Sequence, residues 1–247
     1  MTRTHLTVLL VLAAVCRSSA QSSFSVDPLF VELSAKATNA VVTLTNPTPR
    51  EIRFEIKAFS WVQGPDGRPV LSPTSDIVVF PPLVVLKPKL TQRVRIGTTA
   101  APGTVEKAYR LMVEELPSGV APVTANTVAI RTRVGLPVFV EPTKPSRSGE
   151  VGDVTIVQRR VSVPLRNTGT IHAMVDSVIV RGMSAPDEVA WEAQEGGWYL
   201  LAGQSRTFTH EIAPSQCAVT KAIEVEVYAH DKMIAKRADV PANGCPR

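Results

Sequence analysis

The chain has 247 residues, of which 44% are hydrophobic and 20% are charged, and its formal net charge is +5. This surplus of positive charge is too small to indicate a nucleic-acid-binding protein. After the first twenty residues, no uncharged apolar stretch is long enough for a membrane-spanning helix, so we do not expect a membrane-embedded protein.

The N-terminus has the pattern of a signal peptide. Residues 6–15 form an apolar run, which is too short to cross a hydrocarbon core of ~30 Å as a helix. The small residues Ser18, Ser19 and Ala20 precede Gln21, which predicts cleavage after residue 20 and export to an oxidising compartment. The alternative is lipidation of Cys16, but that motif favours a small residue before the cysteine, and Val15 occupies this position.

Removal of residues 1–20 from the 247-residue chain leaves 227 residues, enough for two domains of ordinary size. The remainder keeps two cysteines, Cys217 and Cys245. Because thiols pair in an oxidising compartment, we expect one disulfide between them, joining two strands of the second domain. Two free buried thiols are the alternative.

Period-two alternation of apolar and polar residues dominates the chain and predicts an all-β fold. The runs are rich in β-branched residues, and Asn, Pro, Gly or charged residues bound them. No amphipathic helix of ordinary length is visible. In the first half these runs are residues 24–26, 41–44, 54–58, 94–96, 111–113 and 128–134. Short strands at this spacing are typical of a β-sandwich.

Residues 141–150 are polar and contain two prolines, which is typical of a linker between domains. We therefore predict one domain over residues 21–142 and a second over residues 143–247. Alternation continues after the linker in residues 154–156, 161–165, 178–180, 206–208 and 223–227. These runs predict a second, smaller sandwich.

The sequence lacks the common catalytic and metal-binding motifs. His172, His210 and His230 have no ligand-like spacing, so we expect no metal site and no cofactor. His230 and Asp231 could orient each other in a hydrolase, but no serine or cysteine nucleophile is tied to them. We therefore expect no catalytic residues and no enzyme activity.

Several segments, in this order and spacing, resemble periplasmic pilus and fimbrial assembly chaperones of the chaperone-usher pathway. They are residues 25–31, 41–47, 80–88, 92–95, 106–117 and 136–140 in the first half, and 167–169 and 198–204 in the second. The resemblance covers essentially the whole mature chain. The Tyr-Arg-Leu segment at 109–111 and the Pro-Val-Phe-Val ending at 137–140 are more similar to the archaic or alternative branch.

The resemblance implies two immunoglobulin-like β-sandwiches in an L-shaped arrangement. It also implies donor-strand complementation, in which the last strand of the first domain is lent to a subunit that lacks a strand. One face of this segment carries the residues that we expect to bind the subunit, namely Thr124, Asn126, Val128 and Ile130. The alternative is that Val128 and Ile130 pack into the protein's own core.

The family holds the C-terminal carboxylate of the subunit with two basic residues, one on the first strand and one near the end of the donor strand. This sequence departs from that pattern, because Phe30 and residues 135–137 occupy the corresponding places. The nearest cations are candidates for the anchor, and each has an ordinary solvated strand face as its alternative: Arg93, Arg95, Arg131 and Arg133.

The resemblance also places charged groups at the junction between the domains. Here the corresponding positions are Glu106, Glu141 and Asp231, which are all acidic and would repel one another. A basic partner, Arg110 or Lys107, is therefore expected if the junction is rigid.

The resemblance implies that the protein captures pilus, fimbrial or spore-coat-like subunits and delivers them to an outer-membrane usher. The partners expected are these proteins, with no nucleic acid and no small-molecule substrate. The alternative is a structural or adhesive immunoglobulin-like protein of a surface assembly, and a hydrolytic enzyme is a third possibility.

Overall fold

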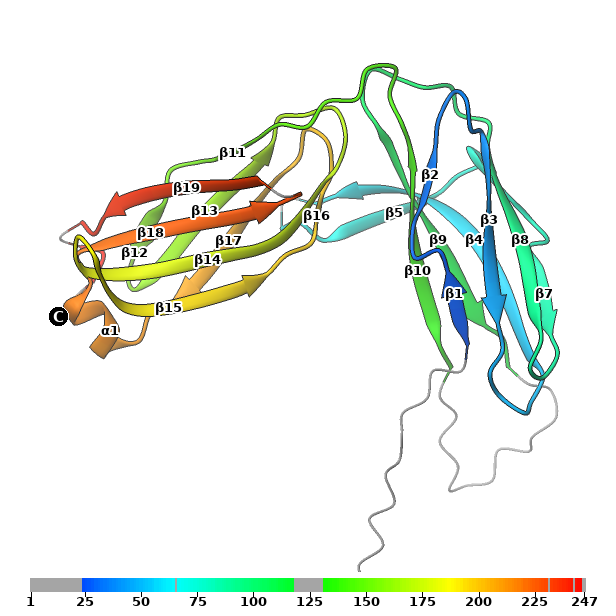
Figure 1. Ribbon diagram of the computed structural model, residues 1–247, viewed down its shortest axis with the longest axis horizontal. Helices are drawn as coiled ribbons and strands as arrows, with labels where there is room; N and C mark the ends of the chain where they lie inside the picture. The colour runs from blue at the N-terminus through cyan, green and yellow to red at the C-terminus, as the bar shows by residue number, and fades with distance from the viewer. Residues whose placement is uncertain (1–23, 65, 118–130, 231, 242, 246–247) are drawn as a thin grey trace, which may run out of the picture.

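The computed structural model describes residues 24–64, 66–117, 131–230, 232–241 and 243–245. These residues form two β-sandwiches that follow one another along the chain and meet at an angle (Figure 1). The predicted all-β class with two immunoglobulin-like domains is confirmed. Within the described ranges, no helix is long and apolar enough to cross a membrane.

The first sandwich packs a four-stranded sheet against a six-stranded sheet. The smaller sheet has the order β1 (Ser25–Asp27), β3 (Asn39–Thr45), β8 (Thr91–Thr98) and β6 (Ile77–Phe80). The larger sheet has the order β2 (Val31–Leu33), β10 (Arg133–Val140), β9 (Lys107–Glu115), β4 (Ile52–Gln63) and β5 (Pro69–Pro73), and β7 (Leu83–Leu86) also pairs with β4. The alternating residues predicted to be apolar face inward, and Phe54, Leu111 and Val113 are fully buried between the sheets.

The first segment of this domain changes sheets. β1 pairs antiparallel with β3 in the smaller sheet, and a cis Asp27–Pro28 bond follows it. The chain then crosses to the larger sheet, where β2 runs parallel to β10. Because β2 has only three residues, it covers only a short part of β10.

The second sandwich also consists of two sheets. One contains β11 (Gly149–Val151), β13 (Arg160–Asn167) and β12 (Thr155–Val157), and β17 (Ser205–Glu211) pairs with β13. The other contains β15 (Glu188–Gly196), β14 (Ala173–Ala185), β18 (Ala222–Ala229) and β19 (Lys232–Asp239), and β16 (Tyr199–Leu200) pairs with β14. Residues 141–148, in the predicted linker, contain no helix or strand. The exact domain boundaries remain predictions.

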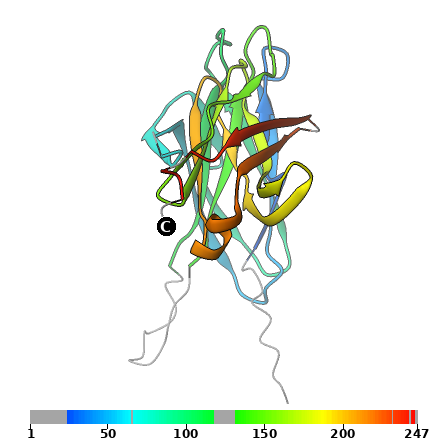
Figure 2. The same cartoon turned by 90° about the vertical axis from the view of Figure 1, so that its left-hand side faces the viewer.

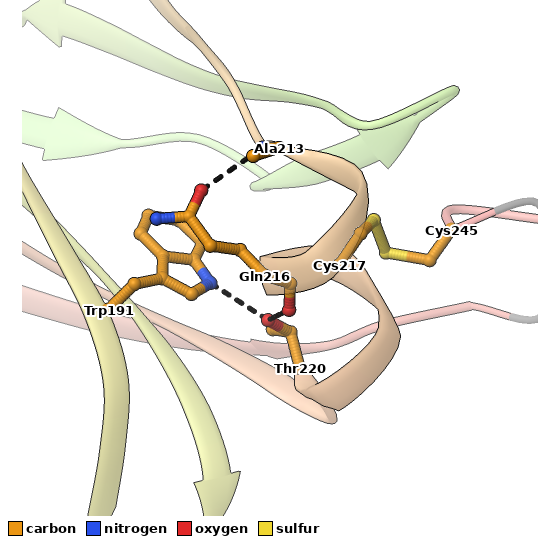
Figure 3. Close-up of a disulfide and its surroundings, with 6 residues drawn as sticks. All are labelled: Trp191, Ala213, Gln216, Cys217, Thr220 and Cys245. Carbon is orange, nitrogen blue, oxygen red and sulfur yellow. Dashed lines mark hydrogen bonds between the residues drawn. A yellow bond between two sulfur atoms is a disulfide. The ribbon is translucent and has the colours of Figure 1, made fainter.

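A disulfide between Cys217 and Cys245 confirms the predicted pairing, with the two Cα atoms 5.5 Å apart (Figure 3). The prediction that it joins two strands was wrong. Cys217 lies on the short helix α1 (Pro214–Val219), and Cys245 lies in the segment after β19. Pro214 at the start of the helix has the φ angle that a first turn needs, and a six-residue helix is too short to show a helical period in the sequence.

Hydrogen bonds around α1 fix it against the second sandwich. The Trp191 indole N–H donates to Thr220 Oγ1 over 2.8 Å, and the Thr220 hydroxyl donates to the carbonyl of Gln216 over 2.7 Å (Figure 3). The helix lies at the end of the sandwich farthest from the first domain, and this end faces the viewer in Figure 2. The disulfide therefore stabilises the second domain away from the junction.

Candidate functional site

Strand β10 has an edge that is only partly paired. It pairs with β9 along its whole length, from Arg133 opposite Glu114 to Val140 opposite Lys107. On the other edge, β2 pairs only with residues 138–140. Among the described residues, positions 133–137 therefore have no strand on that side. An exposed strand edge of this kind is a template for pairing with another chain.

The two faces of β10 have different neighbours. Val134, Leu136 and Val138 face the core of the first sandwich. On the opposite face, Gly135 lies under Met112, because a Cβ at this position would be 3.2 Å from the Met112 sulfur. The unpaired edge is therefore part of a strand whose orientation is fixed by packing on both faces.

Two exposed apolar side chains precede β2. Leu29 is 73% exposed and Phe30 is 46% exposed. In the parallel register of β2 and β10, Val31 is opposite Val138, so continuation of this register would place Leu29 and Phe30 beside residues 136 and 137. The free edge therefore has apolar groups next to it, which a bound strand could cover.

The end of β10 lies at the junction between the domains. Trp61, Phe139 and Leu201 form a small buried cluster there, with Ala108 and Tyr199 packed against it. The side chain of Gln63 adds two hydrogen bonds to the second domain. Its Nε2 donates to the Tyr199 carbonyl over 2.7 Å, and its Oε1 accepts the Leu201 N–H over 2.8 Å. These contacts join the two sandwiches directly.

Glu106 lies at this junction, and its partner is a histidine. Its carboxylate accepts hydrogen bonds from the His172 backbone N–H over 2.8 Å and from His172 Nδ1 over 2.9 Å. The imidazole also stacks on Phe139, with the ring centroids 3.8 Å apart. The side chains of Glu106 and His172 are 4% and 9% exposed. Neither Arg110 nor Lys107, the partners expected from the sequence, fills this role.

Arg110 projects from β9 into the same junction and is only 7% exposed. Its guanidinium carbon lies 3.9 Å from the centroid of the Trp61 ring and 5.5 Å from that of Trp198. Its Nη1 donates to the Gly135 carbonyl over 3.0 Å, on the unpaired part of β10. Within the described part of the chain, its buried Nη2 has no hydrogen-bond partner.

Burial lowers the pKa of Arg110 from its usual value, although the nearby Tyr199 partly opposes this effect. A guanidinium nevertheless stays protonated in proteins. No carboxylate of the described residues lies within ion-pair distance of it. Arg110 is therefore a buried positive charge with an unused hydrogen-bond donor. An incoming anion would neutralise the charge and accept a hydrogen bond from this donor.

A family model described as the N-terminal domain of PapD, a pili and flagellar-assembly chaperone, matches residues 23–146. The chain belongs to this family. No curated protein matches the chain.

Solved chaperone structures have the same fold. The complex of the CsuC chaperone with the CsuE tip adhesion subunit, from archaic chaperone-usher Csu pili of Acinetobacter baumannii, is similar with a TM-score of 0.59 and 19% identity, covering 87% of this chain and 98% of the other. The YadV chaperone is similar with a TM-score of 0.60 and 13% identity over 89% and 100% of the two chains. The Salmonella enterica complex of SafA pilin with the SafB chaperone gives a TM-score of 0.54 and 14% identity over 90% and 99%.

The structure of this chaperone does not bring the four arginines predicted as anchors to the junction. Arg93 and Arg95 are exposed on β8, in the smaller sheet of the first sandwich. Arg131 is exposed just before β10, and Arg133 on β10 pairs with Glu114 over 3.3 Å. Arg133 lies at the opposite end of β10 from Val140, which corresponds to about 20 Å along a strand.

Of the remaining predicted site residues, one directly follows the junction end of β10, and the others lie outside the described residues. Glu141 is exposed, and its backbone N–H donates to the Leu33 carbonyl over 2.8 Å. Asp231 lies outside the described residues, as do the four predicted subunit-binding residues Thr124, Asn126, Val128 and Ile130.

The remaining two histidines among the described residues of the chaperone each contact a different part of the second domain. His230 Nε2 accepts the Met174 N–H over 2.8 Å, and His210 stacks on Trp191 at 5.6 Å between ring centroids. The described residues contain no cluster of three or more His, Cys, Asp or Glu side chains that could hold a metal ion.

Proposed function

We propose that this chaperone acts in the periplasm and binds an incomplete pilus subunit by donor-strand complementation. The observation that carries the proposal is the edge of β10 at residues 133–137, which has no partner strand among the described residues. A strand of the subunit would pair with this edge through main-chain hydrogen bonds. Two of the structurally similar chaperones were solved with a tip subunit or a pilin, which supports a partner of this class.

The side chains that fill the groove of the subunit are proposed to come from the segment before β10. In the sequence, Val128 and Ile130 are two residues apart, so in an extended strand both would lie on one face. Each of these two side chains would contribute about 1.5–3 kcal/mol to the complex when buried in the subunit. The subunit would thereby gain the strand that it lacks.

We propose Arg110, in place of the four arginines predicted from the sequence, as the anchor for the C-terminal carboxylate of the subunit. Its guanidinium lies beside the free edge, and one of its donors lacks a partner among the described residues. Trp198 lies over the guanidinium and is 41% exposed, so rotation of this ring would open the anchor to a ligand. On the donor strand, Thr124 and Asn126 would lie on the same face as Val128 and Ile130, nearer to the start of the strand.

Delivery to an outer-membrane usher completes the proposed function. It is supported by family membership and by the predicted signal peptide at residues 1–20. Glu106 and the contacts of Gln63 would hold the two domains in one orientation while the subunit is bound. Release by strand exchange would need no nucleotide, because folding of the subunit provides the free energy.

The test uses co-expression with the secreted subunits encoded by adjoining genes, followed by pull-down from the periplasm. The variant Val128→Asp with Ile130→Asp should lose subunit capture but keep its unfolding temperature, because a charge on an exposed edge is tolerated. The matched control is Thr127→Asp with Ala129→Asp, on the opposite face of the same segment, and should retain capture.

Three results would contradict this proposal. Unfolding of the first domain in the Val128 and Ile130 variant would show that the two side chains belong to its own core. Capture at the level of the wild type would exclude them from the subunit interface. Polymerisation of the isolated chain would favour a structural subunit of a surface assembly.

A further inference from the structure

The second sandwich contains a cavity of about 320 Å³ near the junction end of the domain. It lies between the sheet of β11 and β13 and the sheet of β14, β18 and β19. Its walls are mostly apolar side chains, contributed by Val151, Leu165, Val175, Leu200, Val227 and Ile234. Cavities of this size and lining are typical of small-molecule sites.

The sequence explains why this space is not filled. On β19 the inward positions are Ile234, Lys236 and Ala238, so only one large aliphatic side chain reaches the core from this strand. Lys236 instead donates to the Gly152 carbonyl over 2.8 Å and to Asp153 over 2.9 Å. Opposite, β11 begins with Gly149, which has no side chain. The open side of the sandwich is therefore joined by polar contacts and leaves a void behind them.

The rim of the cavity carries an excess of positive charge. Among the described residues, Arg147, Arg166 and Lys232 line it together with one carboxylate, that of Glu150. Glu150 lies 3.9 Å from Arg166 and partly neutralises it. Among the described residues, Arg147 and Lys232 have no carboxylate within ion-pair distance. His172 also lines the cavity, but Glu106 accepts its Nδ1 proton.

We propose that this cavity binds a single-chain anionic amphiphile, with the acyl chain between the sheets and the anionic headgroup at Arg147 and Lys232. The volume holds about ten groups the size of a water molecule, which suits a chain of about eight to ten carbons. The apolar wall selects the chain, and the cations at the rim select a carboxylate or a phosphate over a positive headgroup. This site is separate from the free edge of β10 and goes beyond the proposed function.

The test is isothermal titration calorimetry on the mature protein with decanoate, decyl phosphate and decyltrimethylammonium, each below its micelle concentration. We expect saturable binding of one molecule of an anionic ligand, and at least tenfold weaker binding of the cation. Comparison of decanoate with decyl phosphate distinguishes a fatty acid from a phospholipid-derived ligand.

Two variants test the two parts of the site. Ala229→Phe fills the cavity from β18 and should weaken both anionic ligands at least tenfold. Arg147→Glu with Lys232→Glu should weaken them at least tenfold and improve binding of the cation. The matched control reverses two exposed charges of the first domain, Lys36→Glu with Lys87→Glu, and should leave binding unchanged.

The absence of saturable binding to the wild-type protein would overturn the proposal. Equal affinity for the anionic and cationic ligands would overturn the assignment of the headgroup site, and so would an unchanged affinity after the double charge reversal. Because both rim residues are exposed, the charge-reversal variant should fold even if Ala229→Phe does not.

Discussion

Replacement of Arg110 by methionine should separate folding of the chaperone from binding of its subunit. Methionine keeps an apolar stem of similar length against Trp61 but removes the charge. The fold would lose a charged hydrogen bond to Gly135, worth about 1.5–3 kcal/mol, and a cation–π contact worth about 0.5–2 kcal/mol.

The same substitution also removes two unfavourable contributions. The unpartnered Nη2 costs about 1–3 kcal/mol, and burial of an unpaired charge adds to this cost. These contributions offset part of the losses, so the free energy of unfolding should fall by less than about 3 kcal/mol. Urea denaturation of the mature protein measures this quantity.

Subunit binding should respond much more strongly to the same change. Loss of a buried partner for a carboxylate costs about 2–5 kcal/mol, which corresponds to a roughly 30-fold to several-thousand-fold increase in Kd. The assay compares two peptides with the sequence of the last strand of the subunit, one with a free C-terminal carboxylate and one with an amidated C-terminus. Wild-type protein should prefer the free carboxylate, and the Arg110→Met variant should bind both peptides equally.

Arg133→Met is the matched control, because Arg133 is exposed and pairs with Glu114 at the surface. It should keep the preference for the free carboxylate. If Arg110→Met also kept that preference, Arg110 would not be the anchor. A loss of more than about 3 kcal/mol of folding stability in this variant would instead assign the guanidinium a structural role at the junction.

Two further predictions concern the second domain, and both are measured by urea denaturation. Replacement of Cys217 and Cys245 by serine should lower the free energy of unfolding by about 3–4 kcal/mol, as expected for a cross-link with a sequence separation of 28, and reduction of the wild type should give the same loss. Gly182→Ala should destabilise by about 1–3 kcal/mol or more, because its Cβ would lie 2.0 Å from Trp191 Nε1. Gly196→Ala, with no atom within 4 Å of the new Cβ, should have little effect, and equal losses in the two variants would contradict the steric explanation.

The sequence predicts the sandwich class well because burial in a strand has a period of two. Val94 and Ile96 on β8, for example, alternate with exposed arginines, and both are fully buried. Such a pattern reports which face of a strand is inside, but not which neighbour each edge has. The open edge of β10 depends on where the first segment crosses between sheets, and this crossing has no period in the sequence.

The junction was harder to predict for a related reason. Arg110 stands in an apolar run, where its neighbours Tyr109 and Leu111 face the core, and alternation alone places it on a solvated face. Trp198 and Tyr199 of the second domain, which follow much later in the chain, contact the guanidinium from that side, together with Trp61 of the first domain. In the sequence His172 is an isolated histidine, because its partner Glu106 is 66 residues away. Contacts between separate domains leave no periodic pattern in the local sequence.

The amide of Gln63 contacts the second domain only through main-chain atoms, the carbonyl of Tyr199 and the N–H of Leu201. A side-chain amide has the same donor and acceptor as a peptide group, so it extends the sheet hydrogen bonding of one domain onto the backbone of the other. Every residue except proline at position 201 can supply the required N–H, and any residue at position 199 supplies the carbonyl. These two hydrogen bonds across the junction therefore depend on the identity of a single side chain, Gln63, and tolerate substitution in the facing loop, whereas the packing of Tyr199 and Leu201 against Trp61 does not.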